Sequence, residues 1–187
     1  MNLTLHWLMR MKIVTKQFKI VPIDLELHKK IINQWEEDKL NLKDESKFRY
    51  EPHDGYHDLW RLNSNHPLYD LIKFSIPYHE ILYLRNPPKV GLGTPHVDGK
   101  RGCAFNIPIQ VDFNSSLIYT AREECTRLPK SKRLYHYEPE KYDFYNLRQP
   151  ALINTQNPHG GANFADTYRI LLSVSFLESY DFVSTHI

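Results

Sequence analysis

The sequence predicts a mainly β fold, a jelly-roll sandwich with an N-terminal helical support. Two observations carry this prediction. About eight short β-like runs, separated by turn signals, fill the chain from residue 67 onward, and one clearly amphipathic helix precedes them. The length of 187 residues suits one domain. We therefore expect a single domain over 1–187, with the support in 1–66 and the β core in 67–180.

The N-terminal support is expected to contain short strands and one helix. The residue pattern over 12–23 predicts one or two short strands. Asp24 is a typical helix N-cap, and apolar residues then recur at helical spacing, which predicts a helix over about 24–40. Residues 41–66 are polar and rich in turn formers, with a short helix expected around 58–62.

The β core shows its clearest pattern between Cys103 and Phe113. Apolar residues at 105, 107, 109, 111 and 113 alternate with smaller or polar ones, which is typical of a half-buried strand. The charged segment 122–133 is expected to be a solvated loop, with a mobile substrate lid as the alternative. The expected strands are 69–76, 79–86, 103–113, 116–120, 133–138, 142–146, 150–154 and 168–177.

The composition excludes several classes of protein. Hydrophobic residues make up 41% and charged residues 25%, as in ordinary globular proteins, so disorder and coiled coil are excluded as the main state. The formal net charge of +2 and the short basic run at 127–133, which lacks interleaved aromatics, give no reason to expect nucleic-acid binding. The chain has no apolar run long enough for a membrane span and no signal peptide is expected. With only two cysteines, a reducing cytoplasm is the easier interpretation.

The chain is unusually rich in histidine, and the HxD motif formed by His96 and Asp98 is the part of the sequence that indicates a metal site. In an extended segment, residues two apart point to the same side, so an imidazole nitrogen and a carboxylate oxygen can reach one point. A further histidine would complete two nitrogens and one oxygen on one face of an octahedron, the facial triad of non-heme Fe(II) oxygenases. The motif by itself is common, so a third ligand has to be found elsewhere.

His159 and Arg169 supply the rest of the pattern. His159 lies just before the last strongly apolar run, and strands distant in sequence meet in a sandwich, so His159 can join the HxD motif. Arg169 lies within that run, where a buried guanidinium is costly unless an anion meets it. Because a guanidinium binds both carboxylate oxygens, Arg169 can hold the far end of a dicarboxylate that chelates the metal, with a hydroxyl bond from Ser173.

These motifs resemble those of the Fe(II)/2-oxoglutarate-dependent oxygenases, whose fold is a double-stranded β-helix, a jelly-roll that is cupin-like. The runs HVDGKRGCAFNIPI and INTQNPHGGANFADTYRILLSVSF look most like the aspartyl/asparaginyl β-hydroxylase-like branch, and the resemblance covers about 80–178. Some members of that branch lack the carboxylate ligand, whereas this chain keeps Asp98. The nucleic-acid demethylases usually show a second Arg six residues after the first, and this chain has Ser175 there.

The resemblance implies a role for each matching residue. His96, Asp98 and His159 would bind Fe(II), and Arg169 with Ser173 would bind 2-oxoglutarate. Molecular oxygen would then hydroxylate a C–H bond of an amino-acid, peptide or small-molecule substrate, with 2-oxoglutarate converted to succinate and carbon dioxide. The protein would supply geometry and exclusion of water.

Weaker candidates surround this set. Tyr83 and Arg85 lie on the strand before the HxD motif and are expected to touch cosubstrate or substrate, and Asn106 is expected to point into the pocket from the polar side of its strand. Arg101 can pair with Asp98 or a substrate carboxylate, and Asn154 can orient the loop near His159.

Rival interpretations remain open at the level of the sequence. His53 and His57 could share a metal, but Pro52 and Gly55 argue against a helix there and the sequence signals no third ligand. One alternative function is a cupin-type metal enzyme that uses no 2-oxoglutarate. The other is a non-catalytic jelly-roll binding module with a structural or vestigial triad.

Overall fold

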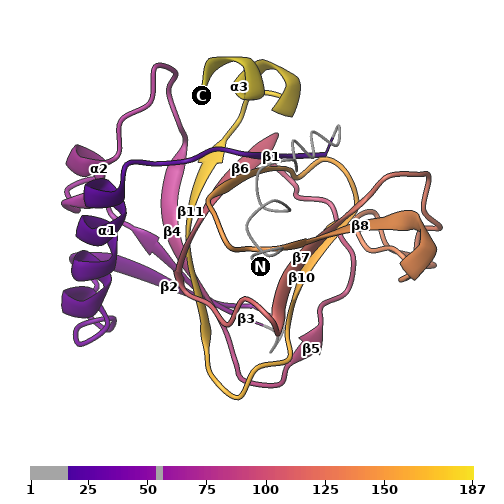
Figure 1. Ribbon diagram of the computed structural model, residues 1–187, viewed down its shortest axis with the longest axis horizontal. Coiled ribbons are helices and arrows are strands. Elements are labelled where there is room, and N and C mark those ends of the chain that lie inside the picture. The colour runs from indigo at the N-terminus through magenta and orange to yellow at the C-terminus, as the bar shows by residue number, and fades with distance from the viewer. Residues whose placement is uncertain (1–16, 54–56) are drawn as a thin grey trace, which may run out of the picture.

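The computed structural model describes residues 17–53 and 57–187, which form two antiparallel sheets with helices at the periphery (Figure 1). The seven-stranded sheet has the order β1 (Phe18–Ile20), β9 (Ala151–Asn154), β6 (Cys103–Gln110), β11 (Arg169–Phe176), β4 (Glu80–Asn86), β3 (His57–Leu62), β2 (Phe48–His53). The four-stranded sheet has the order β5 (Gly91–Leu92), β10 (His159–Asn163), β7 (Ser116–Ala121), β8 (Tyr142–Asn146). The helices are α1 (Leu25–Asp38), α2 (Leu68–Leu71), α3 (Tyr180–His186) and a 3₁₀ turn (Pro139–Lys141).

Helix α1 forms as its sequence predicts. The Asp24 side chain accepts hydrogen bonds from the backbone N–H groups of Glu26 and Leu27, which caps two of the otherwise unpaired amides of the first turn. Ile31 and Trp35, four residues apart, are buried. Figure 1 shows α1 and α2 on one side of the large sheet, with the small sheet on the other side.

The main hydrophobic core lies between these helices and the large sheet. Along β6, Phe105 and Ile107 point into this core, whereas Ala104 and Asn106 line a cavity on the opposite face. On β11, Leu172 and Val174 are likewise in the core. The alternation is confirmed along β6, and it gives each central strand one face toward the helices and one toward the cavity. The strand ends at Gln110 rather than 113, Phe113 is exposed, and β6 is buried on both faces rather than half-buried.

Several expected elements are confirmed and others are wrong. The runs 79–86, 103–113, 116–120, 142–146, 150–154 and 168–177 correspond to β4, β6, β7, β8, β9 and β11, and the strand expected within 12–23 is β1 in its described part. The short helix expected at 58–62 is instead strand β3, because Trp60 and Leu62 pack into the core while their backbones pair with β2 and β4.

Two further strand predictions fail. Residues 69–76 contain the helical turn α2 rather than a strand, because Leu68 and Ile72 bury one apolar face at a spacing of four. Residues 133–138 contribute only isolated bridges, His96 to Leu134 and Arg127 to Tyr135, and no strand. None of the helices in the described residues is both long enough and apolar enough to span a bilayer.

Candidate metal centre

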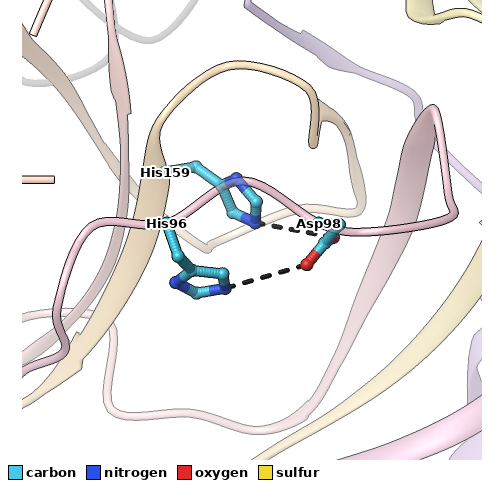
Figure 2. Close-up of side chains that lie close together, drawn as sticks. All are labelled: His96, Asp98 and His159. Atoms are coloured by element: carbon cyan, nitrogen blue, oxygen red, sulfur yellow. Dashed lines mark ion pairs between the residues drawn. The ribbon is translucent and has the colours of Figure 1, made fainter. Parts of the chain in front are cut away.

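His96, Asp98 and His159 come together at one point (Figure 2). Their ligand atoms all lie within 4.8 Å of one another. Asp98 is the central member, with Oδ1 3.8 Å from His96 Nε2 and Oδ2 3.7 Å from His159 Nε2. Ligands about 2.1 Å from an ion in facial geometry are about 3 Å apart, so small side-chain rotations bring the three atoms to bonding positions.

The backbone holds the two histidines side by side. His96 lies in the segment between β5 and β6, and His159 is the first residue of β10. The two residues form an isolated antiparallel bridge in which each N–H donates to the other's carbonyl at 2.9 Å. The Asp98 N–H donates to the Thr155 carbonyl at 2.9 Å, which fixes the third ligand against the turn that precedes β10.

Both imidazoles are oriented with Nε2 toward the shared point. His96 Nδ1 lies 3.0 Å from the Thr94 carbonyl oxygen, and His159 Nδ1 lies 2.9 Å from the Asn157 carbonyl oxygen. A carbonyl oxygen can only accept, so each Nδ1 carries the proton and each Nε2 presents its lone pair. Backbone carbonyls that fix the tautomer in this way are typical of metal-ligating histidines.

Electrostatics keep Asp98 ionised. Burial raises its pKa, but the charge of Arg101 and the neighbouring His159 outweigh burial and bring the pKa to about 2. The Arg101 Nε–H donates to Asp98 Oδ2, which leaves Oδ1 for a metal. The predicted pairing of Arg101 with Asp98 is thus what the structure shows.

His159 is buried and neutral at ordinary pH. Burial lowers its pKa to about 4, although the charge of Asp98 partly opposes the shift. The side chains of His159, Asp98 and His96 are 8%, 15% and 32% exposed, in that order. The three side chains therefore lie on the inner side of the site, and the site is most open beside the partly exposed His96.

One cavity extends from the triad into the space between the two sheets. Its volume is about 640 Å³, which lies in the range of small-molecule sites. The three ligands, Asn106 and Arg169 all line it. Of the eight predicted site residues, these five line the cavity, whereas Ser173, Tyr83 and Arg85 are not among its lining residues.

Arg169 is 5% exposed and is held firmly in this cavity. Its Nε donates to Asn86 Oδ1 at 2.9 Å, and its Nη1 donates to the carbonyls of Leu117 at 2.8 Å and Ala162 at 3.2 Å. These neutral oxygens orient the guanidinium. A Cβ added to Gly161 would lie 2.5 Å from Arg169 Nη2, so the glycine leaves the space that the guanidinium occupies.

Two residues with buried polar atoms are cross-strand partners on the cavity-facing side of the large sheet. Ser173 on β11 pairs in register with Asn106 on β6. Ser173 Oγ and Asn106 Oδ1 are both buried and have no hydrogen-bond partner in the described structure. Such atoms are costly to leave unpaired, which points to a ligand or solvent that binds next to them.

The structure does not bring Tyr83 and Arg85 to the site. Both point from β4 to the helix-covered side, because alternation places them opposite Leu82 and Leu84, which line the cavity. The Tyr83 hydroxyl donates to Asp38 Oδ2 at 2.6 Å behind the sheet. Arg85 donates to Asp58 Oδ2 at 2.7 Å through Nη2 and lies over the Trp60 ring.

The remaining sequence candidates are placed as follows. Asn154 Oδ1 accepts from the Gln156 N–H at 3.1 Å, so it shapes the turn before His159 as expected. His57 lines the cavity but is not part of the cluster of possible ligands, and the side chain of His53 lies outside the described residues. Sequence reasoning missed Arg49, Arg61 and Arg133 as cavity residues, since no motif marks them.

No family model and no curated protein matches the chain, but solved structures share its fold. The epimerase SnoN, solved with Fe³⁺, alpha ketoglutarate and nogalamycin RO, aligns with a TM-score of 0.56 at 8% identity, over 87% of this chain and 79% of that one. The chain has a cupin-like jelly-roll fold. This jelly-roll chain is also similar to AviO1 from Streptomyces viridochromogenes, with a TM-score of 0.50 at 9% identity over 88% and 90% of the two chains. A cupin domain of Drosophila melanogaster CENP-C aligns more distantly, with a TM-score of 0.38 at 10% identity over 68% and 74%.

Proposed function

We propose that this cupin-like chain is an Fe(II)/2-oxoglutarate-dependent dioxygenase that hydroxylates a C–H bond of an amino-acid, peptide or small-molecule substrate. The single observation that carries the proposal is that His96, Asp98 and His159 converge in the cavity that also contains the buried Arg169. The triad would bind the metal and Arg169 would bind a carboxylate, and 2-oxoglutarate needs both contacts.

The donor set fits iron. Two imidazole nitrogens and one carboxylate oxygen are the facial triad of non-heme Fe(II) enzymes, and they leave coordination positions for cosubstrate and oxygen. In this role His96 and His159 would bind the metal through Nε2, and Asp98 would bind it through Oδ1 while Arg101 holds Oδ2. When bound, iron and 2-oxoglutarate supply the oxidising chemistry that protein side chains lack.

The cavity fits 2-oxoglutarate at its other end. Arg169 would bind the distal carboxylate, since its side chain reaches Gly161, two residues along β10 from the ligand His159. The unpaired Ser173 Oγ and Asn106 Oδ1 lie on the same face of the large sheet and offer polar contacts for the bound molecule or its water. SnoN, which has the same fold, was solved with iron and alpha ketoglutarate, and this supports the pairing of these two groups.

The finer assignments are also proposals. The aspartyl/asparaginyl β-hydroxylase-like branch is supported by the sequence runs around His96 and His159. A reducing cytoplasmic location is supported by Cys103 and Cys125, which are both free thiols. A single domain over 1–187 is supported by the contribution of N-terminal strands β1, β2 and β3 to the same sheet as β6 and β11.

One observation favours a second candidate, a cupin-type metal enzyme that uses no 2-oxoglutarate. Arg169 already donates three hydrogen bonds to Asn86, Leu117 and Ala162, which is a structural role that needs no ligand. In that case the metal site would be retained and Arg169 would serve only to join β11 to the small sheet.

Turnover of 2-oxoglutarate separates the two candidates. Protein loaded with Fe(II) is supplied with 2-oxoglutarate and oxygen, and succinate is measured. We expect slow succinate formation from the wild type, none from Asp98→Ala, and an increase of at least tenfold in the KM for 2-oxoglutarate in Arg169→Gln. Arg85→Gln is the matched control, because it removes the same charge from the opposite face of the sheet. Absence of succinate from the iron-loaded wild type would refute the proposal.

A further inference from the structure

Cationic side chains are frequent in the lining of the cavity. Among the described residues, six arginines and lysines line it, together with two carboxylates, Glu80 and Asp98. The six are Arg49, Arg61, Lys100, Arg101, Arg133 and Arg169.

One group of cations comes from the edge of the large sheet. Arg49 on β2 and Arg61 on β3 are directly opposite each other in the antiparallel register, and both line the cavity. Like charges in this position repel. Arg61 is paired with Glu80, so one carboxylate offsets part of the local charge.

The second group comes from the segment that carries the metal ligands. Lys100 and Arg101 follow Asp98 directly, and the guanidinium of Arg133 lies against Gly99, where a Cβ would overlap it. The Val97 N–H donates to the Arg133 carbonyl at 2.9 Å, which fixes the backbone of Arg133 beside the ligand segment. Arg133 and Lys100 are exposed, so both can meet a molecule that enters the cavity.

The proposed metal and cosubstrate do not consume this charge. Fe(II) contributes two positive charges and 2-oxoglutarate two negative ones, so together they add no net charge beside Lys100 and Arg133. Positively charged clefts concentrate anions and bind them through charge-assisted hydrogen bonds. We infer that the substrate is an anion, a molecule with a carboxylate or phosphate group that is held by Arg133 and Lys100 next to the metal centre.

This inference rests on the proposed function and names the substrate class for that site. It also makes a claim that does not require turnover, because the cations are present in the protein without metal. Binding of small anions is therefore a readout that is separate from 2-oxoglutarate chemistry.

The test compares three probes that share a phenyl ring: phenyl phosphate, phenylacetate and neutral 2-phenylethanol. Binding to the full chain is measured by isothermal titration calorimetry, first without metal and then with Zn(II) and saturating 2-oxoglutarate, which would occupy Arg169. We expect at least one anion to bind at least tenfold more tightly than 2-phenylethanol in both conditions. Binding of phenyl phosphate alone would identify a phosphate substrate, and binding of phenylacetate alone a carboxylate.

The matched variants are Arg133→Gln and Lys132→Gln. Both remove one positive charge from exposed neighbouring positions, but only Arg133 lines the cavity. Arg133→Gln should weaken anion binding about tenfold, the usual worth of one charge-assisted hydrogen bond, and Lys132→Gln should leave it unchanged. Equal affinities for the neutral and anionic probes, or equal effects of the two variants, would overturn the inference. Failure of 2-oxoglutarate to bind, with anion binding retained in metal-free protein, would refute the proposed function alone.

Discussion

Gly161 shows at the scale of a single residue how the site depends on a missing side chain. A Cβ at this position would lie 2.5 Å from Arg169 Nη2 and 2.8 Å from Nη1. Gly161→Ala should therefore displace the guanidinium and weaken 2-oxoglutarate binding about tenfold, as expected for loss of one charged hydrogen bond. Calorimetry on Zn(II)-loaded protein measures this. Metal affinity should stay within about twofold, and unchanged affinity for both ligands would contradict the account.

His159 gives a second prediction at this scale, through the stability of the metal-free protein. Its pKa is about 4 in the folded state against the usual 6.5 of histidine, so the unfolded chain binds more protons between these values. Stability must then fall as pH drops from about 7 to about 4.5, by about 2 kcal/mol from this group. Urea unfolding at pH 7 and pH 4.5 measures the change.

His159→Gln removes that titrating group while it keeps a polar side chain. The loss of unfolding free energy between pH 7 and pH 4.5 should be smaller in this variant than in the wild type by about 2 kcal/mol. The same variant should bind Zn(II) at least tenfold more weakly, because one of three ligands is gone. Identical pH dependences in the two proteins would show that His159 is not held neutral by burial.

At the scale of the elements, a buried polar cluster joins α1 to the large sheet. Asp38, at the end of α1, accepts from the Tyr83 hydroxyl at 2.6 Å and lies 3.1 Å from His66 Nε2. Burial raises the pKa of Asp38, but hydrogen bonds from His66 and Tyr83 bring it below its usual value. The group therefore stabilises the fold above the ordinary aspartate pKa, and this contribution is lost at lower pH.

Tyr83→Phe distinguishes the structural role of Tyr83 in this cluster from the contact with cosubstrate or substrate that the sequence predicts. Loss of a hydrogen bond to a buried carboxylate should lower the unfolding free energy by about 1–3 kcal/mol, which urea denaturation measures. Tyr168→Phe, at a side chain that is 43% exposed, is the control and should change stability little. Because Tyr83 points away from the cavity, 2-oxoglutarate affinity should be unchanged. A tenfold loss of that affinity with unaltered stability would contradict the structure.

The same elements show what sequence patterns can and cannot predict. Alternation along β4 correctly separates Tyr83 and Arg85 from Leu82 and Leu84, but it does not tell which face looks into the cavity. That choice depends on α1, which covers one face of the sheet. Strand β10 was not predicted because its sequence, HGGAN, has two glycines and little β propensity, and its pairing with β7 and β5 is a long-range effect.

At the scale of the whole molecule, the topology explains why the convergence of His96, Asp98 and His159 could be predicted and the cavity cations could not. The HxD motif places two of the three by local geometry, and the late histidine follows because β10 lies beside the segment of His96. Arg49, Arg61 and Arg133 come from separate parts of the chain with no shared motif. They line one cavity only because folding brings the edge of the large sheet close to the segment that contains His96 and Asp98.

The central claim is that one cavity binds a metal through His96, Asp98 and His159 and 2-oxoglutarate through Arg169. Anaerobic addition of Fe(II) and then 2-oxoglutarate tests it most directly, through the weak visible charge-transfer band of the chelated complex. The account predicts a band that saturates with one equivalent of each component in the wild type, persists in Arg85→Gln, and requires much higher 2-oxoglutarate in Arg169→Gln. Absence of the band in the wild type, or a band in Arg169→Gln at unchanged 2-oxoglutarate affinity, would contradict it.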